Sequence, residues 1–268
     1  MAVCPLLRGL RATLISCRKQ LFPRTPFAAI IGTRFFIVQI SSAIFECSAP
    51  DLDSCPDESL PEFAFIGRSN VGKSSLLNFL AGEAGLARVS PTPGFTKLIN
   101  MFTMNRTWRL VDLPGYGFAS GAKKDRQRFN KAVAAYLKHR TNLCLVFALI
   151  ESGLPPQDID IEFVEWLVRN GVPFVLVFTK TDKIPPAETQ ANIAAFMARI
   201  AAWFEQPPAY FTCSTVAGQG RAALLGVIGE AMTAIEAEAA QAAPASDGSP
   251  AKPPKVSPRT RPDLARPW

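Results

Sequence analysis

One short segment, GRSNVGKS at Gly67–Ser74, constrains the fold of this 268-residue chain more than any other feature. An apolar run of strand length precedes the segment, and a helical pattern follows it. In that setting the pattern G-x-x-x-x-G-K-[ST] is typical of a phosphate-binding loop. Its backbone N–H groups and the helix N-terminus face a phosphate. Lys73 reaches the β- and γ-phosphates, and the Ser74 hydroxyl can ligate Mg²⁺.

The chain around this loop alternates between strand-like and helix-like patterns. The six predicted strands are Glu62–Gly67, Lys97–Met104, Thr107–Leu113, Asn142–Ile150, Pro173–Thr179 and Ala209–Cys213. The five predicted helices are Lys73–Leu80, Lys123–Arg140, Gln157–Asn170, Ala187–Phe204 and Arg221–Ala240. This alternation predicts an α/β fold of the P-loop NTPase kind, with a mainly parallel six-stranded sheet and helices on both faces. The two-residue gap Asn105-Arg106 predicts a hairpin, and therefore one antiparallel edge strand.

A second candidate site segment is DLPG at Asp112–Gly115, which follows another predicted strand. Asp112 can hold Mg²⁺ through water, and the Gly115 N–H can contact a γ-phosphate, as in a switch loop. Between this segment and the phosphate loop, TPGFTKLIN offers Thr92 and Thr96 as further Mg²⁺ ligands. Spacing alone does not choose between these two threonines.

The base of the nucleotide is indicated by TKTD at Thr179–Asp182, at the end of a buried strand. The Asp182 carboxylate can accept hydrogen bonds from both the N1–H and the 2-amino group of guanine. Adenine has no such donor pair, so the pattern favours guanine. The Lys180 stem can cover the base plane. Thr215, in CSTVAGQG, either contributes to the base pocket or belongs to a plain turn.

The two ends of the chain carry its excess positive charge, which is +7 overall. Residues 1–45 contain six basic residues and no acid, with leucines at helical spacing, which predicts an organellar transit peptide over residues 1–42. A membrane anchor at Phe27–Phe45 is an alternative that Arg34 disfavours by about 2.5–3.5 kcal/mol, and a plain basic tail is another. Residues 241–268 are predicted to be a disordered Pro-rich basic tail, or alternatively an arm that touches RNA.

The six cysteines are scattered and include no CxxC pair. This distribution disfavours a disulfide framework or a structural zinc site and fits a reducing compartment.

Several of these segments together resemble the EngB (YihA/YsxC) family of TRAFAC-class GTPases. The matching strings are LPEFAFIGRSNVGKSSLLNFL, TPGFTKLINMF, RLVDLPGYGFA, TKTDK and CSTVAGQG, and the resemblance extends from about Ala43 to Ile235. It implies a GTPase domain over residues 43–240. Members of the family assist assembly of the large ribosomal subunit with GTP, and organellar members carry an N-terminal presequence.

The resemblance also implies roles for individual residues. It favours Thr96 over Thr92, makes Ser74 and Thr96 the Mg²⁺ ligands, and gives catalytic roles to Lys73, Thr96 and Gly115. The residues implied to contact GTP are Gly67, Arg68, Ser69, Asn70, Val71, Gly72, Lys73, Ser74, Gly94, Phe95, Thr96, Lys97, Leu98, Asp112, Leu113, Pro114, Gly115, Thr179, Lys180, Thr181, Asp182, Cys213, Ser214 and Thr215.

The sequence departs from the family pattern at three places. Phe95 stands where the family usually has Arg or Lys, Thr179 stands where most GTPases have Asn, and Val216-Ala217 replaces Leu-Lys. Phe95 removes a positive charge beside the γ-phosphate or, alternatively, an RNA contact. The departures in the base-recognition loops bear on affinity for the base rather than on which base is bound.

The position after the DxxG motif predicts slow hydrolysis of GTP. Ras-like GTPases place a water-orienting Gln there, whereas this chain has Tyr116. A tyrosine that points away from the phosphates cannot take that role, so an activator is expected. Asn70 matches an asparagine that holds an activating K⁺ in some related GTPases, and the alternative is a loop-stabilising role.

The function implied by the resemblance is a monomeric GTP switch that assists large-subunit assembly in an organelle, either the mitochondrion or, alternatively, the plastid. The second hypothesis is a GTP-dependent switch with a protein or membrane partner and no ribosomal role.

Other residues carry weaker signals. His139 is interpreted as a partner of a helix C-terminus, and Arg126 and Arg128 as a solvated helix face or, alternatively, an RNA contact.

Overall fold

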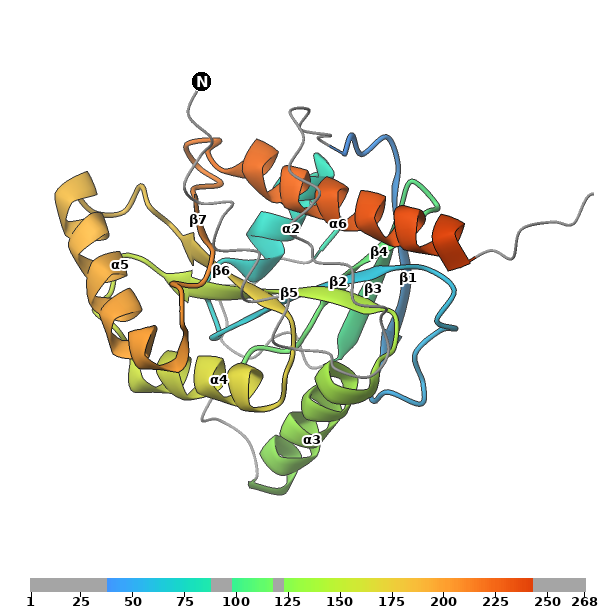
Figure 1. Cartoon of the computed structure of the whole chain (residues 1–268), viewed down its shortest axis with the longest axis horizontal. Helices are drawn as coiled ribbons and strands as arrows, with labels where there is room; N and C mark the ends of the chain where they lie inside the picture. Colours follow the sequence, from blue (N-terminus) through green and yellow to red (C-terminus); the bar gives the residue numbers. More distant parts are fainter. Residues whose placement is uncertain (1–37, 88–97, 118–122, 243–268) are drawn as a thin grey trace, which may run out of the picture.

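A seven-stranded mixed sheet forms the centre of the protein (Figure 1). The computed structural model describes residues 38–87, 98–117 and 123–242. The strands are β1 (Ala43–Ala49), β2 (Glu62–Gly67), β3 (Ile99–Met104), β4 (Trp108–Asp112), β5 (Leu143–Glu151), β6 (Phe174–Thr179) and β7 (Tyr210–Cys213). Their order across the sheet is β1-β3-β4-β2-β5-β6-β7. Five adjacent strands run parallel to one another, namely β4, β2, β5, β6 and β7. The pairs β1–β3 and β3–β4 are antiparallel.

The extra strand β1 corrects the predicted sheet, which had six strands and a single antiparallel strand at its edge. In the structure β3 is an inner strand, because β1 pairs along its outer side. The β1 segment lacks a clean alternation of buried and exposed residues. Ile44 and Phe45 are consecutive and both about half exposed, at 52% and 51%, and the register shifts between Phe45 and Cys47. An irregular edge strand of this kind gives little period-2 signal.

The predicted hairpin between β3 and β4 is confirmed, although three residues rather than two separate the strands, since Met104 pairs with Trp108. Asn105 and Arg106 have φ values of 51° and 59°, and the Thr107 N–H donates to the Met104 carbonyl over 3.0 Å. Two successive residues with positive φ are typical of a type I′ turn, whose twist matches that of the flanking strands.

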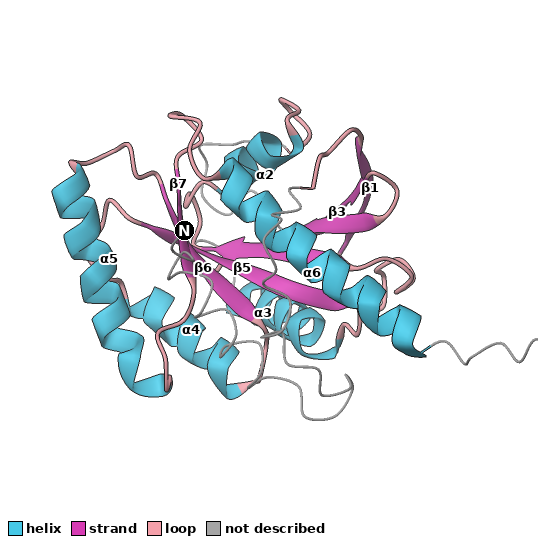
Figure 2. Cartoon of the chain, turned by 45° about the horizontal axis from the view of Figure 1, so that its top comes forward, coloured by secondary structure: helices cyan, strands magenta, loops and turns pink. Residues whose placement is uncertain are grey.

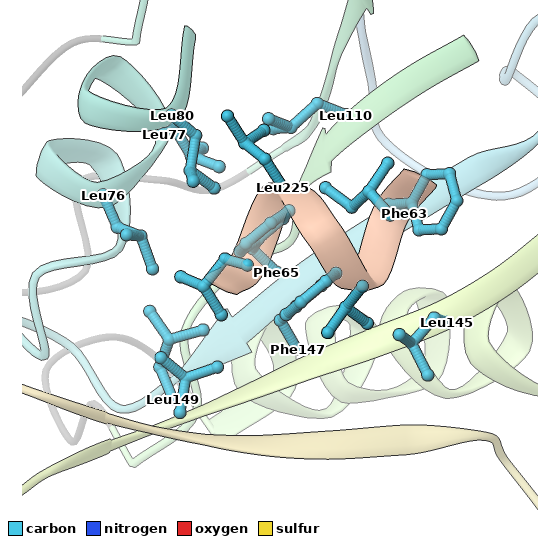
Figure 3. Close-up of a cluster of buried hydrophobic side chains, with 14 of the residues drawn as sticks. Phe63, Phe65, Leu76, Leu77, Leu80, Leu110, Leu145, Phe147, Leu149 and Leu225 are labelled. Atoms are coloured by element: carbon cyan, nitrogen blue, oxygen red, sulfur yellow. The ribbon is translucent and has the colours of Figure 1, made fainter. Parts of the chain in front are cut away.

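Helices cover both faces of the sheet, as predicted (Figures 1 and 2). They are α2 (Lys73–Ala81), α3 (Lys123–His139), α4 (Asp158–Arg169), α5 (Pro186–Ile200) and α6 (Arg221–Ala242). One apolar cluster joins the sheet to α2 and α6, and a second joins its other face to α3, α4 and α5. Figure 3 shows Phe65 and Phe147 of the sheet facing leucines of α2 and α6. The predicted helix Ala187–Phe204 is shorter, since α5 gives way to a 3₁₀ turn at Ala201–Trp203.

A buried ionic cluster lies at the amino end of β2, where Glu62 is fully buried. The Tyr136 hydroxyl donates to Glu62 Oε2 over 2.6 Å, and Arg140 pairs with Glu62 Oε1 over 2.6 Å. Because Tyr136 lies on α3 and Arg140 directly follows it, the cluster fixes the end of that helix against the sheet.

No helix within the described ranges is long and apolar enough to cross a bilayer.

Candidate functional site: a nucleotide-binding edge of the sheet

The predicted site segments meet at one edge of the sheet. The phosphate loop follows β2, Asp112 ends β4, Thr179 ends β6 and Cys213 ends β7. These four strands are parallel, so their carboxyl ends lie on the same side. Ligands of open α/β sheets bind outside the carboxyl ends of the strands.

The phosphate loop has a backbone that depends on its glycines. Gly72 has a φ of 100° and immediately precedes α2, which begins at Lys73. At Gly67, a Cβ atom would lie 2.7 Å from the Leu149 carbonyl oxygen of β5, so a side chain would push the loop off the sheet. The glycines therefore allow the loop to pack closely on the sheet and to lead into α2, whose N-terminus lies at the strand ends as anion binding requires.

Lys73 and Asp112 form a buried ion pair between the phosphate loop and the DLPG segment. The Lys73 Nζ atom lies 2.5 Å from Asp112 Oδ1, and the two residues are only 8% and 2% exposed. Burial raises the pKa of Asp112, and the neighbouring Lys73 ammonium opposes that rise. The site thus places a cation that suits phosphate directly beside a carboxylate that suits a metal.

The donor set at this point fits Mg²⁺. Apart from the Lys73 ammonium, no hydrogen-bond donor in the described part of the chain reaches Asp112 Oδ1. Ser74 supplies a hydroxyl in the first turn of α2. Hard oxygen donors of these two kinds are the ligands that Mg²⁺ prefers. The other predicted ligand, Thr96, lies outside the described residues.

The DLPG segment lies directly against the phosphate loop. The Tyr116 N–H donates to the Gly67 carbonyl over 3.2 Å, and the Ser69 N–H donates to the Tyr116 carbonyl over 3.3 Å. A Cβ atom on Gly115 would lie 2.9 Å from the Gly67 carbonyl oxygen. Glycine is therefore required at this close approach, which brings the predicted γ-phosphate contact, the Gly115 N–H, next to the phosphate loop.

The Tyr116 side chain is turned toward α4. Its hydroxyl donates to Asp160 Oδ1 over 3.0 Å, and its ring stacks on Phe163 with a centroid distance of 4.4 Å. Tyr116 therefore does not occupy the position that a water-orienting glutamine requires.

The base-recognition loop is tied to the phosphate loop by two side chains. The buried Thr179 hydroxyl donates to the Val71 carbonyl over 2.7 Å. The Lys180 ammonium donates to the Asn70 carbonyl over 2.5 Å and pairs with Glu151 over 3.0 Å. Burial lowers the pKa of Lys180, and the hydrogen bond that its ammonium donates to Glu151 opposes that change. The stem of Lys180 consequently spans the space between the two loops.

Asp182 meets the last loop of the site through Ser214. The Ser214 hydroxyl donates to Asp182 Oδ1 and accepts from the Ala217 N–H over 2.9 Å. Ser214 is fully buried, while Val216 is 84% exposed. The contact orients the Asp182 carboxylate, and it brings the segment Cys213–Thr215 beside the predicted base site.

Some of the residues predicted from the sequence lie away from the nucleotide site or outside the described residues. Gly94, Phe95, Thr96 and Lys97 fall outside the described residues, and Leu98 is 39% exposed. The backbone of Arg126 and Arg128 belongs to α3, but their side chains are not described. His139 is the last residue of α3 and is exposed, as expected for a partner of a helix C-terminus.

Two acidic residues of this region were not predicted from the sequence. Glu151 ends β5 and pairs with Lys180, and Asp160 contacts Arg68 and Tyr116 from α4. A signal for Asp160 exists, because it shares the buried face of α4 with Val164 and Leu167 at helical spacing. A carboxylate on an apolar helix face requires a specific partner.

A phosphate loop, a DxxG loop and a guanine-recognition loop at the carboxyl edge of one sheet define a P-loop GTPase. Residues 62–180 match the family described as "50S ribosome-binding GTPase". The chain is 45% identical over 191 residues to the "Probable GTP-binding protein EngB" of Bacteroides fragilis, covering 71% of this chain and 95% of the relative. It is 46% identical over 189 residues to the protein of the same name from Cytophaga hutchinsonii, with coverages of 70% and 95%. The chain therefore belongs to the EngB family of GTPases.

Two solved structures show the same fold at low sequence identity. Aquifex aeolicus Era bound to GDP·AlF₄⁻ superposes with a TM-score of 0.53 at 20% identity, covering 64% of this chain and 56% of Era. Toc33 from Arabidopsis thaliana gives a TM-score of 0.52 at 18% identity, with coverages of 66% and 85%.

Proposed function

We propose that this EngB-family GTPase is a slow, monomeric GTP switch that binds the large ribosomal subunit in its GTP-bound state. It would assist assembly of that subunit in an organelle, the mitochondrion being our first choice and the plastid the alternative. The observation that carries the proposal is the convergence of Lys73, Asp112 and Asp182 at one sheet edge. The family description, "50S ribosome-binding GTPase", supports the ribosomal partner.

The chemistry of the switch follows from the residues at the sheet edge. Lys73 and the phosphate loop hold the β- and γ-phosphates, and the Gly115 N–H contacts the γ-phosphate. Ser74 and Thr96 would ligate Mg²⁺, with Asp112 acting through water. When bound, the metal neutralises charge that develops on the phosphoryl oxygens. Loss of the γ-phosphate removes the contact at Gly115, and this makes the DLPG segment sensitive to the nucleotide state.

Slow intrinsic hydrolysis follows from the orientation of the Tyr116 side chain, which is turned toward α4. Because its hydroxyl contacts Asp160, no side chain at that position orients the attacking water. K⁺ held by Asn70, or a surface of the ribosome, would complete the site. If Asn70→Ala responds to K⁺ and Na⁺ as the wild type does, the K⁺ part of the proposal is wrong.

Sedimentation with ribosomal subunits tests the partner. Purified chain is mixed with large or small subunits in the presence of GDP or a non-hydrolysable GTP analogue, and subunits are pelleted. We expect co-sedimentation with large subunits in the analogue only. No association in either nucleotide state would contradict the proposal and leave a protein or membrane partner as the other hypothesis.

A reporter fusion tests the compartment. The acid-free residues 1–45 are joined to a fluorescent protein and imaged in cells with markers for both organelles. Import into mitochondria is expected. Diffuse fluorescence would show that the segment is not a presequence, and plastid fluorescence would select the alternative organelle.

A further inference from the structure

A buried carboxylate joins three segments beside the nucleotide site. Asp160 lies in the first turn of α4, and its side chain is 1% exposed. The Arg68 Nε atom donates to both Asp160 oxygens, each over 3.0 Å. The Tyr116 hydroxyl donates to Asp160 Oδ1 over 3.0 Å.

The arrangement has the partners that a buried carboxylate needs. Burial raises the pKa of Asp160, and the charge of Arg68 opposes that rise. Burial also raises the pKa of Tyr116 well above 10, so its hydroxyl keeps its proton and remains a donor. An ionised acceptor makes these hydrogen bonds stronger than neutral ones. Asp160 therefore links α4 to the phosphate loop through Arg68 and to the DLPG segment through Tyr116.

The two partners of Asp160 each adjoin a residue of the nucleotide site. Arg68 follows Gly67 of the phosphate loop, and Tyr116 follows Gly115 of the DLPG segment. The backbones of Arg68 and Tyr116 also form a parallel bridge. Packing is tight on the α4 side, since a Cβ atom on Gly117 would lie 3.0 Å from Ile159 Cδ1.

The phosphate loop has further attachments that do not involve Asp160. Thr179 binds the Val71 carbonyl, and Lys180 binds the Asn70 carbonyl. A change at Asp160 should therefore disturb the position of Gly115 more than the β-phosphate cradle. The Gly115 N–H serves the γ-phosphate, whereas GDP has only the α- and β-phosphates.

We propose that Asp160 is a positioning residue that acts through Tyr116 and Arg68 to fix Gly115 for the γ-phosphate. It thereby sets the preference of the site for GTP over GDP. The proposal rests on the proposed function in one respect, namely that the site binds guanine nucleotides. α4 thus becomes part of the nucleotide-sensing unit through Asp160.

The test compares the affinities of full-length variants for GDP and for a non-hydrolysable GTP analogue by fluorescence titration with Mg²⁺. Asp160→Asn is expected to lower the ratio of analogue affinity to GDP affinity about tenfold. Asp158→Asn is the matched control, because Asp158 is an exposed acid of the same first turn that pairs with Arg199 over 2.8 Å. Its ratio should equal that of the wild type.

Tyr116→Phe keeps the stacked ring and removes only the hydroxyl, so it tests the link if Asp160→Asn folds poorly. It should shift the ratio in the same direction by a smaller factor, and the double variant should shift it by less than the product of the two factors. An unchanged ratio in Tyr116→Phe, or an equal loss of GDP and analogue affinity in Asp160→Asn, would overturn the positioning role. Failure of the wild type to bind GDP would instead overturn the proposed function.

Discussion

Thr179 shows how a single hydroxyl can replace the asparagine that most GTPases have at this position. It is 4% exposed, and its short side chain reaches the Val71 carbonyl of the phosphate loop over 2.7 Å. The base-recognition loop and the phosphate loop are thus joined by one buried hydrogen bond. A buried acceptor that loses its donor costs about 1–3 kcal/mol.

Thr179→Val keeps the shape of the side chain and removes the donor to Val71. We expect the free energy of unfolding to fall by about 1–3 kcal/mol and the affinity for GDP to fall roughly three- to tenfold. Urea unfolding and fluorescence titration measure the two effects. Thr212→Val is the control, because Thr212 is exposed on β7 and should change neither quantity. Equal stability and equal GDP affinity in the two variants would show that the hydrogen bond from Thr179 to Val71 does not couple the base-recognition loop to the phosphate loop.

At the scale of residues, the sequence predicted the site segments whose chemistry is local. The glycine-rich loop places Lys73 and Ser74 within a few residues of one another, and the guanine contact expected of Asp182 needs only its own carboxylate. Contacts between distant segments were not predictable, because they depend on how helices and loops pack. Asp160 lies 92 residues from Arg68 in the chain, and only the packed fold brings the two together.

At the scale of elements, the edge strand β1 depends on polar contacts that cross the sheet. Glu46 of β1 accepts a hydrogen bond from Thr103 of β3 over 2.7 Å and pairs with Arg109 of β4 over 2.8 Å. One carboxylate therefore holds three neighbouring strands. The hydrogen bond from Arg109 lowers the pKa of Glu46 below its ordinary value of 4.5, although partial burial opposes the change.

A pH dependence of stability follows from this contact. A carboxylate whose pKa is lower in the folded state stabilises the fold above its unfolded pKa and loses that effect as the pH falls through the folded pKa. Glu46→Gln should therefore lower stability by about 1 kcal/mol at pH 7, and the difference from wild type should shrink below pH 4.5.

Urea unfolding of both proteins between pH 7 and pH 3 measures this difference. Glu188→Gln, at an exposed position in the first turn of α5, serves as the control and should follow the wild type throughout. A constant gap between Glu46→Gln and wild type at every pH would show that the Arg109 pairing does not stabilise β1.

The elements themselves were predictable to different degrees, for physical reasons. Strands β5 and β6 are buried on both faces and form continuous apolar runs, so their sequences alone identify them. The β3–β4 turn is short and local, and Asn105 and Arg106 adopt its positive φ values within the three residues between the strands. By contrast, β1 is half exposed and bulged, and α5 passes into a 3₁₀ turn after Ile200. In both cases tertiary contacts decide the structure more than local pattern does.

At the scale of the whole molecule, the charge is distributed unevenly. Residues 1–45 carry +6 and residues 241–268 carry +3, which leaves residues 46–240 with a net charge of −2. The GTPase body is thus close to neutral. Any affinity for RNA must come from local patches or from the terminal segments rather than from the net charge.

The start of the folded body is a second property of the whole chain. The domain boundary predicted from the sequence lies at residue 43, yet Val38 and Ile40 pack against the core. The Asn105 side chain also accepts from the Ser41 N–H over 2.8 Å and donates to the Gln39 carbonyl over 2.6 Å. A chain of residues 38–242 should therefore be more stable than one of residues 43–242, by about 1–3 kcal/mol. Equal thermal midpoints would contradict this.

We propose that the whole protein is a guanine-nucleotide switch whose catalytic site is incomplete until a partner binds. The most direct test is single-turnover hydrolysis of GTP by the full chain, measured with and without large ribosomal subunits, with Lys73→Ala as the inactive reference. We predict slow hydrolysis by the chain alone and a clear acceleration by large subunits, both abolished in Lys73→Ala. Hydrolysis at one fast rate in both conditions, or wild-type turnover no greater than that of Lys73→Ala, would contradict the account.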